Sequence, residues 1–346
     1  QGDTSCIERE QAMTFSPTAE SSPTHAPERL IETVQVLQCG RAEQHWEHRY
    51  GSKLPQLWWV FFGRRWVELP LQAFLIEHRD GLVLFDTGID PAVQLDSSYI
   101  KQTIGRFLLP RIFRFRLADA DRIDHVLSRI DVSAEEIKMA VISHLHFDHV
   151  GGIRHIPQAE LLVSEAEWQI LSEPHPEQEW ILREHIEIPS EKWRQISFEP
   201  SNDPLFEDFE GIHDVAGDGS MILLPTPGHT KGSMSLLIRG EGWRPILLVA
   251  DLTYETALLE RDQVPGTGDL TFANSIPAGT CNFLVTAAGS LNWSNVTHTI
   301  DLTLSGVYCV DTTFGYELLN DYTTIGTVTA PGYAPVSYTH LTLPTT

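Results

Sequence analysis

Cysteine is scarce in this chain of 346 residues: it has four, and none of them stands in a CxxC pair. The scarcity excludes a thiolate zinc site and a disulfide framework as the expected basis of the fold. Long apolar runs are also lacking, since no segment approaches the roughly 20 residues that a membrane-spanning helix needs, and no signal-peptide pattern opens the chain. We therefore expect a cytoplasmic protein with no membrane partner.

Basic residues are the second shortage, because 24 Lys and Arg stand against 47 Asp and Glu, for a formal net charge of -23. A surface this acidic repels phosphate backbones, which excludes nucleic acid as an expected partner. Hydrophobic residues make up 42% of the chain, an ordinary share for a globular protein. The length allows one large domain or two smaller ones.

Composition divides the chain into three parts. Residues 1–29 are rich in Ser, Thr, Pro and Glu and have no apolar period, which predicts a disordered N-terminal segment. Residues 30–268 carry the apolar patterns of a folded domain. Residues 269–346 contain no Lys or Arg and are rich in Thr, Ser, Gly and Asn, which predicts a β-rich or disordered tail.

The last part of that tail, from Val336 to Thr345, is similar to the translation of a sequencing adaptor. We therefore interpret 269–346 as a segment that is not homologous to the domain before it, joined to that domain in a chimaeric reading frame. A genuine β-rich appendage is the alternative interpretation.

Branched and aromatic runs in the domain predict short strands at 31–37, 58–62, 66–69, 73–76 and 82–85. Asp80-Gly81 is typical of the hairpin turn that would join the last two. Residues 103–117 predict a helix packed on the core, with a pocket lid or a homodimer surface as alternatives. Ser164 with Glu167 forms a capping-box pattern that opens further helices. Strands followed by alternating helices and strands favour an α/β (α+β) class with two sheets and helices outside.

The strongest chemical signal follows a predicted strand at 139–143, which runs directly into the segment His144-Leu-His146-Phe-Asp148-His149. In an extended segment alternate side chains lie on one side, so His144, His146 and Asp148 can converge on one point. His149 is offset, as expected where the chain turns into a helix and faces a second metal ion. Imidazole nitrogen and carboxylate oxygen suit zinc, and also iron, manganese or cobalt.

This segment resembles the HxHxDH signature of the metallo-β-lactamase superfamily, and later segments agree with the family in order. His229, framed by Pro and Gly after a strand, is similar to the next metal-binding His of that family. Asp251, at the end of a predicted strand, is similar to its bridging carboxylate. Asp86 matches an Asp that orients the ligands through hydrogen bonds. The resemblance covers about 30–269 and implies an αββα sandwich that holds two divalent metal ions at one sheet edge.

Within that family, Asp251-Leu-Thr-Tyr254 resembles the D-x-x-Y of N-acyl homoserine lactonases, in which the Tyr contacts the substrate carbonyl; a packing tyrosine is the alternative. The resemblance implies a quorum-quenching hydrolase that opens a small-molecule lactone or ester, with Asp148 passing a proton to the leaving oxygen. A thioesterase resembling glyoxalase II is the competing enzyme. An acyl pocket, or a core strand, would contain the aromatic residues Trp58, Trp59, Phe61, Phe62 and Trp66.

One ligand that the resemblance implies is missing from the sequence. The family supplies a last His to the second metal from a loop beyond the bridging Asp, and the later histidines here, His298 and His340, stand in no matching frame. The first metal site would be complete with His144, His146, His229 and Asp251. The second would keep only Asp148, His149 and Asp251. An inactive chain that binds a single metal ion is therefore the non-enzymatic alternative.

Overall fold

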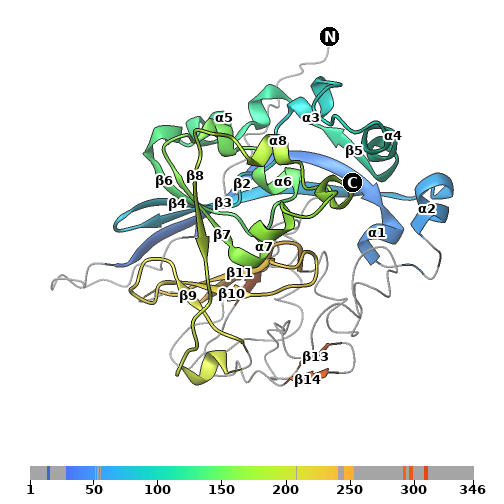
Figure 1. Cartoon of the computed structure of the whole chain (residues 1–346). Helices are drawn as coiled ribbons and strands as arrows, with labels where there is room; N and C mark the ends of the chain where they lie inside the picture. Colours follow the sequence, from blue (N-terminus) through green and yellow to red (C-terminus); the bar gives the residue numbers. More distant parts are fainter. Residues whose placement is uncertain are drawn as a thin grey trace, which may run out of the picture.

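The computed structural model describes residues 14–15, 29–50, 52, 54, 56–207, 209–240, 245–252, 291–293, 296–298 and 308–310. Figure 1 shows their arrangement: helices such as α5 and α8 lie on one face of a large sheet, and a smaller sheet lies against its other face. The functional residues singled out in the sequence fall at strand ends of these two sheets, so the pairing of the strands determines where they meet.

The large sheet has eight strands in the order β1-β2-β3-β4-β6-β7-β8, with β5 also paired to β2. Their bounds are β1 (Thr14–Phe15), β2 (Ile31–His45), β3 (Trp66–His78), β4 (Gly81–Phe85), β5 (Phe113–Arg116), β6 (Ile137–Val141), β7 (Glu160–Ser164) and β8 (Lys192–Ile196). The strands β2, β3 and β4 pair antiparallel, whereas β4, β6, β7 and β8 run parallel. Because parallel strands end at the same edge, the residues after β4 and β6 are brought side by side.

The smaller sheet has five strands in the order β15-β12-β11-β10-β9. Their bounds are β9 (His213–Asp214), β10 (Met221–Pro225), β11 (Met234–Ile238), β12 (Ile246–Leu248) and β15 (Tyr308–Val310). The strands β9 to β12 pair antiparallel, and β15 runs parallel to β12. A separate antiparallel pair is formed by β13 (Leu291–Trp293) and β14 (Val296–His298).

The helices are short. They are α1 (Trp46–Tyr50), α2 (Gln56–Phe62), α3 (Ala92–Leu95), α4 (Thr103–Ile112), α5 (Ile123–Ser128), α6 (Phe147–Val150), α7 (Glu165–Ile170) and α8 (Arg183–Ile186), with 3-10 turns at Asp119–Asp121, Ala134–Glu136, Ile153–His155, Pro176–Glu179, Pro204–Phe206 and Ala250–Leu252. Throughout the described ranges, none of the helices combines the length and the apolar character needed to cross a bilayer.

Apolar side chains fill both faces of the large sheet. Phe74 of β3 packs with Leu236 and Leu247 in the cluster between the two sheets. The next residue, Leu75, packs with Leu127 of α5 in the cluster under the helices. Successive side chains of a strand point to opposite faces, so one strand supplies both layers, which agrees with the layered arrangement predicted from the sequence.

The strand predicted at 58–62 is wrong, because these residues form the helix α2 (Gln56–Phe62). Trp59 and Val60 are buried against Ile112 of α4, whereas Trp58 and Phe62 are largely exposed. Aromatic and branched residues favour strands only weakly, and packing outweighs that preference. Here the contact of one helix face with α4 determines the local structure.

The helix predicted over 103–117 is correct only for its first part. The helix α4 ends at Ile112, shortly after Pro110, and Phe113–Arg116 form the strand β5, which pairs antiparallel with β2. Two arginines alternate with the two phenylalanines of this segment, and the arginines are the exposed ones. That period of two is the strand signal that the helical interpretation overlooked.

The strands predicted at 66–69 and 73–76 are one strand, β3, interrupted only in its pairing. Pro70 lies opposite Arg41, next to a bulge in β2 where Gly40 has a φ of +111°. A proline has no N–H for the ladder, and a bulge is one of the few sheet positions that tolerate it. The predicted hairpin at Asp80-Gly81 is confirmed, since β3 pairs directly with β4.

Replacing Gly151 by Ala should destabilise the fold. A Cβ there would lie 2.2 Å from the backbone nitrogen of Asp90 and 2.6 Å from the backbone carbon of Ile89, so main chain would have to move. Overpacking of this kind costs about 1–3 kcal/mol or more in the free energy of unfolding, measurable by urea denaturation followed through Trp fluorescence.

The matched control for that measurement is Gly105→Ala in α4, where the nearest atom to the new Cβ is a side-chain methyl of Ile100 at 3.1 Å. Alanine is favoured over glycine inside a helix by about 0.8–1 kcal/mol, so this variant should be neutral or more stable. Equal stability losses in both variants would contradict the close approach at Gly151.

Candidate metal centre

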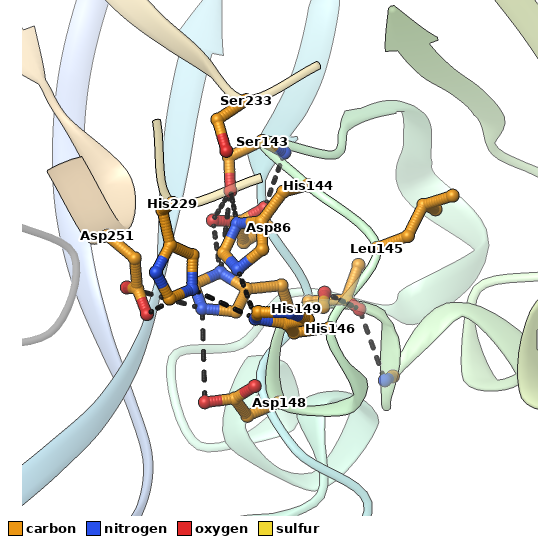
Figure 2. Close-up of polar contacts among 12 residues, drawn as sticks. Asp86, Ser143, His144, Leu145, His146, Asp148, His149, His229, Ser233 and Asp251 are labelled. Atoms are coloured by element: carbon orange, nitrogen blue, oxygen red, sulfur yellow. Dashed lines mark hydrogen bonds and ion pairs between the residues drawn. The ribbon is translucent and has the colours of Figure 1, made fainter. Parts of the chain in front are cut away.

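Three segments place polar side chains at one edge of the paired sheets. The loop after β6 carries His144 and leads through His146 into α6. The loop after β10 carries His229, and Asp251 lies in the 3-10 turn after β12. Figure 2 shows these side chains facing a shared space, with Asp148 at its border. Residues up to 107 positions apart in the sequence therefore meet because each follows a strand that ends at this edge.

Three imidazole rings form the first group. The Nδ1 atom of His146 lies 3.1 Å from Nε2 of His144 and 2.9 Å from Nε2 of His229. Their donor atoms all lie within 4.8 Å of one another. One ring nitrogen that faces two others cannot satisfy both by hydrogen bonding, so the arrangement has the form of ligands that converge on one ion.

The second group consists of His144, His149 and Asp251, whose donor atoms also lie within 4.8 Å of one another. One carboxylate oxygen of Asp251 lies 3.4 Å from Nε2 of His149, and the other lies 3.4 Å from Nε2 of His229. Asp251 therefore faces both groups, as a bridging carboxylate would. Asp148 is close to the second group, with its Oδ2 at 3.9 Å from Nε2 of His149.

The carboxylate of Asp86 orients the rings of His144 and His149 from the side away from the shared space. It accepts hydrogen bonds from the backbone N–H of Ser143 at 2.7 Å, from the Ser143 hydroxyl at 2.8 Å and from Nδ1 of His149 at 2.8 Å. Because the Ser143 proton goes to Asp86, the hydroxyl oxygen accepts from Nδ1 of His144 at 3.0 Å. In their neutral forms both rings then carry the proton on Nδ1 and turn the Nε2 lone pair toward the centre, as metal-binding histidines require.

In three of the four rings the pKa is shifted toward the neutral form that metal binding requires, and His149 is the exception. Burial, together with the neighbouring rings, holds the pKa values of His144 and His146 well below the usual range, which keeps both rings neutral. Burial also lowers the pKa of His229, and it raises the pKa of the Asp148 carboxyl. For His149 burial acts downward, but Asp86, Asp251 and Asp148 outweigh it and raise the pKa.

The donor set fits divalent first-row ions. Imidazole nitrogens and carboxylate oxygens, buried together and supported by a carboxylate–histidine hydrogen bond, are the usual surroundings of zinc, iron, manganese or cobalt. Burying such charged groups is costly unless they are paired or bind a metal. The predicted ligands His144, His146, Asp148, His149, His229 and Asp251 are thus brought together, and their role as ligands stays a prediction.

Other predicted residues either lie outside the described part of the chain or are divided between core and surface. Tyr254 and His340 lie outside the described residues, as does the side chain of His298. Of the aromatic residues considered for an acyl pocket, Trp59 is fully buried in the core. Trp58, Phe61 and Phe62 of α2 are each 47% or more exposed, so the helix divides them between core and surface.

Sequence reasoning did not identify three residues near the site. Ser143 carries the hydrogen bonds between Asp86 and His144, and Glu167 had been recognised only as part of a capping box. Burial, followed by neighbouring His229, lowers the pKa of His48 in α1 to about 4. No motif connects these residues with metal binding, and their role follows only from the tertiary arrangement.

Two packed sheets with histidines and aspartates clustered at one shared edge are the arrangement expected of a metal-dependent hydrolase. The family profile of the metallo-beta-lactamase superfamily matches residues 67–294. This chain belongs to the metallo-β-lactamase superfamily. The predicted αββα class and the predicted hydrolase are therefore confirmed at the level of the family. The match ends 25 residues beyond 269, where the sequence changes its composition.

Several known proteins are similar to this chain. An N-acyl homoserine lactonase of a Bacillus species is 31% identical over 203 residues, which is 58% of this chain and 71% of the relative. The N-acyl homoserine lactonase AttM of Rhizobium johnstonii is 29% identical over 204 residues, with the same coverage. Both matches extend over most of the relative's own length.

Solved structures show the same fold. A variant of B. thuringiensis AiiA with N-decanoyl-L-homoserine bound at its active site has a TM-score of 0.55 at 22% identity, covering 70% of this chain and 84% of the other. An N-acyl homoserine lactone hydrolase with N-hexanoyl-L-homoserine bound at its catalytic metal centre has a TM-score of 0.54 at 22% identity, with the same coverage.

Replacing His146 by Ala should remove metal from the purified protein. This ring lies between His144 and His229 and offers Nδ1 to both neighbours. We expect metal affinity to fall by more than the roughly 10–100-fold that the loss of an outer hydrogen-bond partner costs, as measured by elemental analysis after gel filtration. His175→Ala, at a ring whose side chain is 66% exposed, is the control that should keep the parent's content. Equal metal in both variants would refute the assignment.

Proposed function

We propose that this chain hydrolyses N-acyl homoserine lactones and thereby quenches quorum sensing. The observation that carries the proposal is the placement of Asp251, whose two oxygens face His149 and His229 at 3.4 Å each. A carboxylate shared between two ligand groups suits two metal ions, and such centres hydrolyse esters and related bonds. The relatives named above, which are N-acyl homoserine lactonases, support the choice of substrate.

In this proposal two divalent ions are held by the residues already described. His144, His146 and His229 would hold one ion, Asp148 and His149 the other, and Asp251 would contact both. Zinc is the proposed metal, with iron, manganese and cobalt as alternatives because they accept the same donors. When bound, the ions would supply a Lewis acid for the substrate carbonyl and would lower the pKa of water.

The protein's own groups would then orient and protonate the substrate. Asp86 and Ser143 fix the ring orientation of His144 and His149. Asp148 would take up the proton released as water adds to the carbonyl carbon, and would pass it to the ring oxygen as the C–O bond of the lactone breaks. Tyr254 would donate a hydrogen bond to the carbonyl oxygen as negative charge develops on it.

The division into residues 1–29, 30–268 and 269–346 stays a prediction, as do the chimaeric origin of the last part, the cytoplasmic location and a homodimer. β15 in that last part pairs with β12 of the smaller sheet. The expected lack of a final His for the second ion also remains a prediction. It matters for activity, because the second ion would then depend on Asp148, His149 and Asp251 alone.

The substrate is tested with the full chain supplied with Zn²⁺. We expect turnover of N-decanoyl homoserine lactone, none of a glutathione thioester, and loss of lactone turnover in His146→Ala. Turnover of the thioester in preference to the lactone would instead support the glyoxalase II-like alternative. A parent protein that holds at most one ion per chain and hydrolyses neither substrate would refute the proposal and support the alternative of an inactive metal-binding chain.

Tyr254→Phe tests the assignment to the lactonase subgroup. The substitution removes one hydroxyl, so metal content should stay at the parent level while lactone turnover falls. A donor to a developing oxyanion is typically worth about 10²–10³-fold in rate, and the loss should appear in kcat rather than in KM alone. Unchanged turnover would make Tyr254 a packing residue and weaken the choice of a lactone substrate.

A further inference from the structure

Glu167 is a fully buried carboxylate in the first turn of α7 that the proposed chemistry does not use. Its backbone N–H donates to the hydroxyl of Ser164 at 3.1 Å, which is half of the capping box expected from the sequence. In a complete capping box the Glu side chain would turn back to the start of its own helix. Here the carboxylate points instead at two loops that carry candidate metal ligands.

Each oxygen of Glu167 binds a different loop. Oε1 accepts from the backbone N–H of Leu145 at 2.9 Å. Oε2 accepts from the hydroxyl of Thr230 at 2.6 Å and from the backbone N–H of Gly232 at 2.9 Å. Leu145 lies between His144 and His146, and Thr230 directly follows His229, so every hydrogen bond is made within three residues of a candidate ligand.

The two loops need such a connection because they come from different sheets. His144 and His146 follow β6 of the large sheet, whereas His229 follows β10 of the smaller one. The hydrogen bonds between strands within either sheet do not determine the distance between these two segments. A backbone hydrogen bond from Met234 to Ser143, at 3.1 Å, joins the loops on the side of β11, and Glu167 joins them from α7.

Close packing makes the contact with α7 rigid. A Cβ on Gly232 would lie 2.0 Å from the backbone nitrogen of Glu167 and 2.4 Å from its Cα, so the loop lies directly on the helix. The hydroxyl of Ser164 donates to the carbonyl oxygen of Gly232 at 2.7 Å. The loop is thus bound to α7 through both its N–H and its C=O.

We infer that Glu167 is a positioning residue, which sets the distance between the His144–His146 segment and His229 and thereby the geometry of the first metal site. The inference rests on the proposed function insofar as those rings bind a metal. A carboxylate suits the position because its two oxygens only accept, and all three partners donate. An amide of the same size would turn an NH₂ group toward one of those donors and lose at least one hydrogen bond.

The test is Glu167→Gln, compared with the parent by Zn²⁺ affinity and by the visible absorption of the Co²⁺-substituted protein. Groups that orient metal ligands from outside typically change affinity by about 10–100-fold. We expect a loss of this size and altered Co²⁺ bands, since the bands report the geometry of the ligands rather than overall stability. Neither measurement requires turnover of any substrate.

Leu127→Ala is the matched control for a general loss of stability. Leu127 is fully buried under the helices, in a cluster that includes Ile123 and Leu161, and its carbonyl oxygen accepts from Ile130 and Val132 rather than from a candidate ligand. It should lower Tm while leaving Zn²⁺ affinity and the Co²⁺ bands unchanged. If Glu167→Gln lowers Tm in the same way and leaves both metal readouts at the parent values, Glu167 is only a core residue and the inference is overturned.

Thr230 provides a second, milder pair of variants in case Glu167→Gln does not fold. Thr230→Val removes one of the three donors at nearly constant volume, and Thr230→Ser keeps the hydroxyl. We expect Val to weaken Zn²⁺ binding and Ser to restore it, whereas equal affinities in the two variants would count against the inference. A parent that binds Zn²⁺ but opens no lactone would refute the proposed function alone; a parent that binds no Zn²⁺ would refute both.

Discussion

The buried carboxylate of Asp86 is the group on which the geometry of the candidate metal centre depends. It is fully buried at the end of β4, where an unpaired charge would cost several kcal/mol. Hydrogen bonds from Ser143 and His149 offset that cost. The backbone of Asp86 has a φ of +58°, a conformation that costs a non-glycine residue about 1–3 kcal/mol. The strain is maintained because the backbone N–H of Asp86 donates to Val141 of β6 at 2.8 Å while Ser143 and His149 hold its carboxylate.

The parallel pairing of β4 with β6 is what makes this contact possible. Residues after these strands share an edge of the sheet, so Asp86 meets the loop that begins at Ser143 without any long connection. The smaller sheet contributes the remaining groups, His229 and Asp251, at its own strand ends. The apolar cluster between the sheets therefore does more than stabilise the fold, because the distance between the two halves of the site follows from how that cluster packs.

The sequence predicted those parts of the site that are encoded by local spacing. The alternation of His144, His146 and Asp148 and the offset of His149 are visible in six consecutive residues, and the hairpin at Asp80-Gly81 rests on two. The confirmed family followed from the order of these motifs along the chain.

What the sequence did not predict depends on contacts between distant segments. The helix α2 replaced a predicted strand because its buried face packs on α4, and β5 formed because β2 offers it an edge. Glu167 has the same explanation. Its local pattern correctly indicated a cap at Ser164, but the partners of its carboxylate lie 22 and 65 residues away, at Leu145 and Gly232. Such partners cannot be deduced from the spacing of residues on one helix.

The same cluster links stability to ligand binding. The rings of His144 and His146 are buried in their neutral form, so no charge has to be removed from water. Asp148, in contrast, is buried at a position where its carboxyl pKa is raised. A cation at the centre would favour the ionised carboxylate and pair it with positive charge, and binding to the folded state alone would add to its stability. Hydrogen bonds from Asp86, Ser143 and Glu167 preorganise the donors before that happens. Folding thus already supplies the free energy that brings these groups together, so fewer side chains have to become ordered when a metal ion binds.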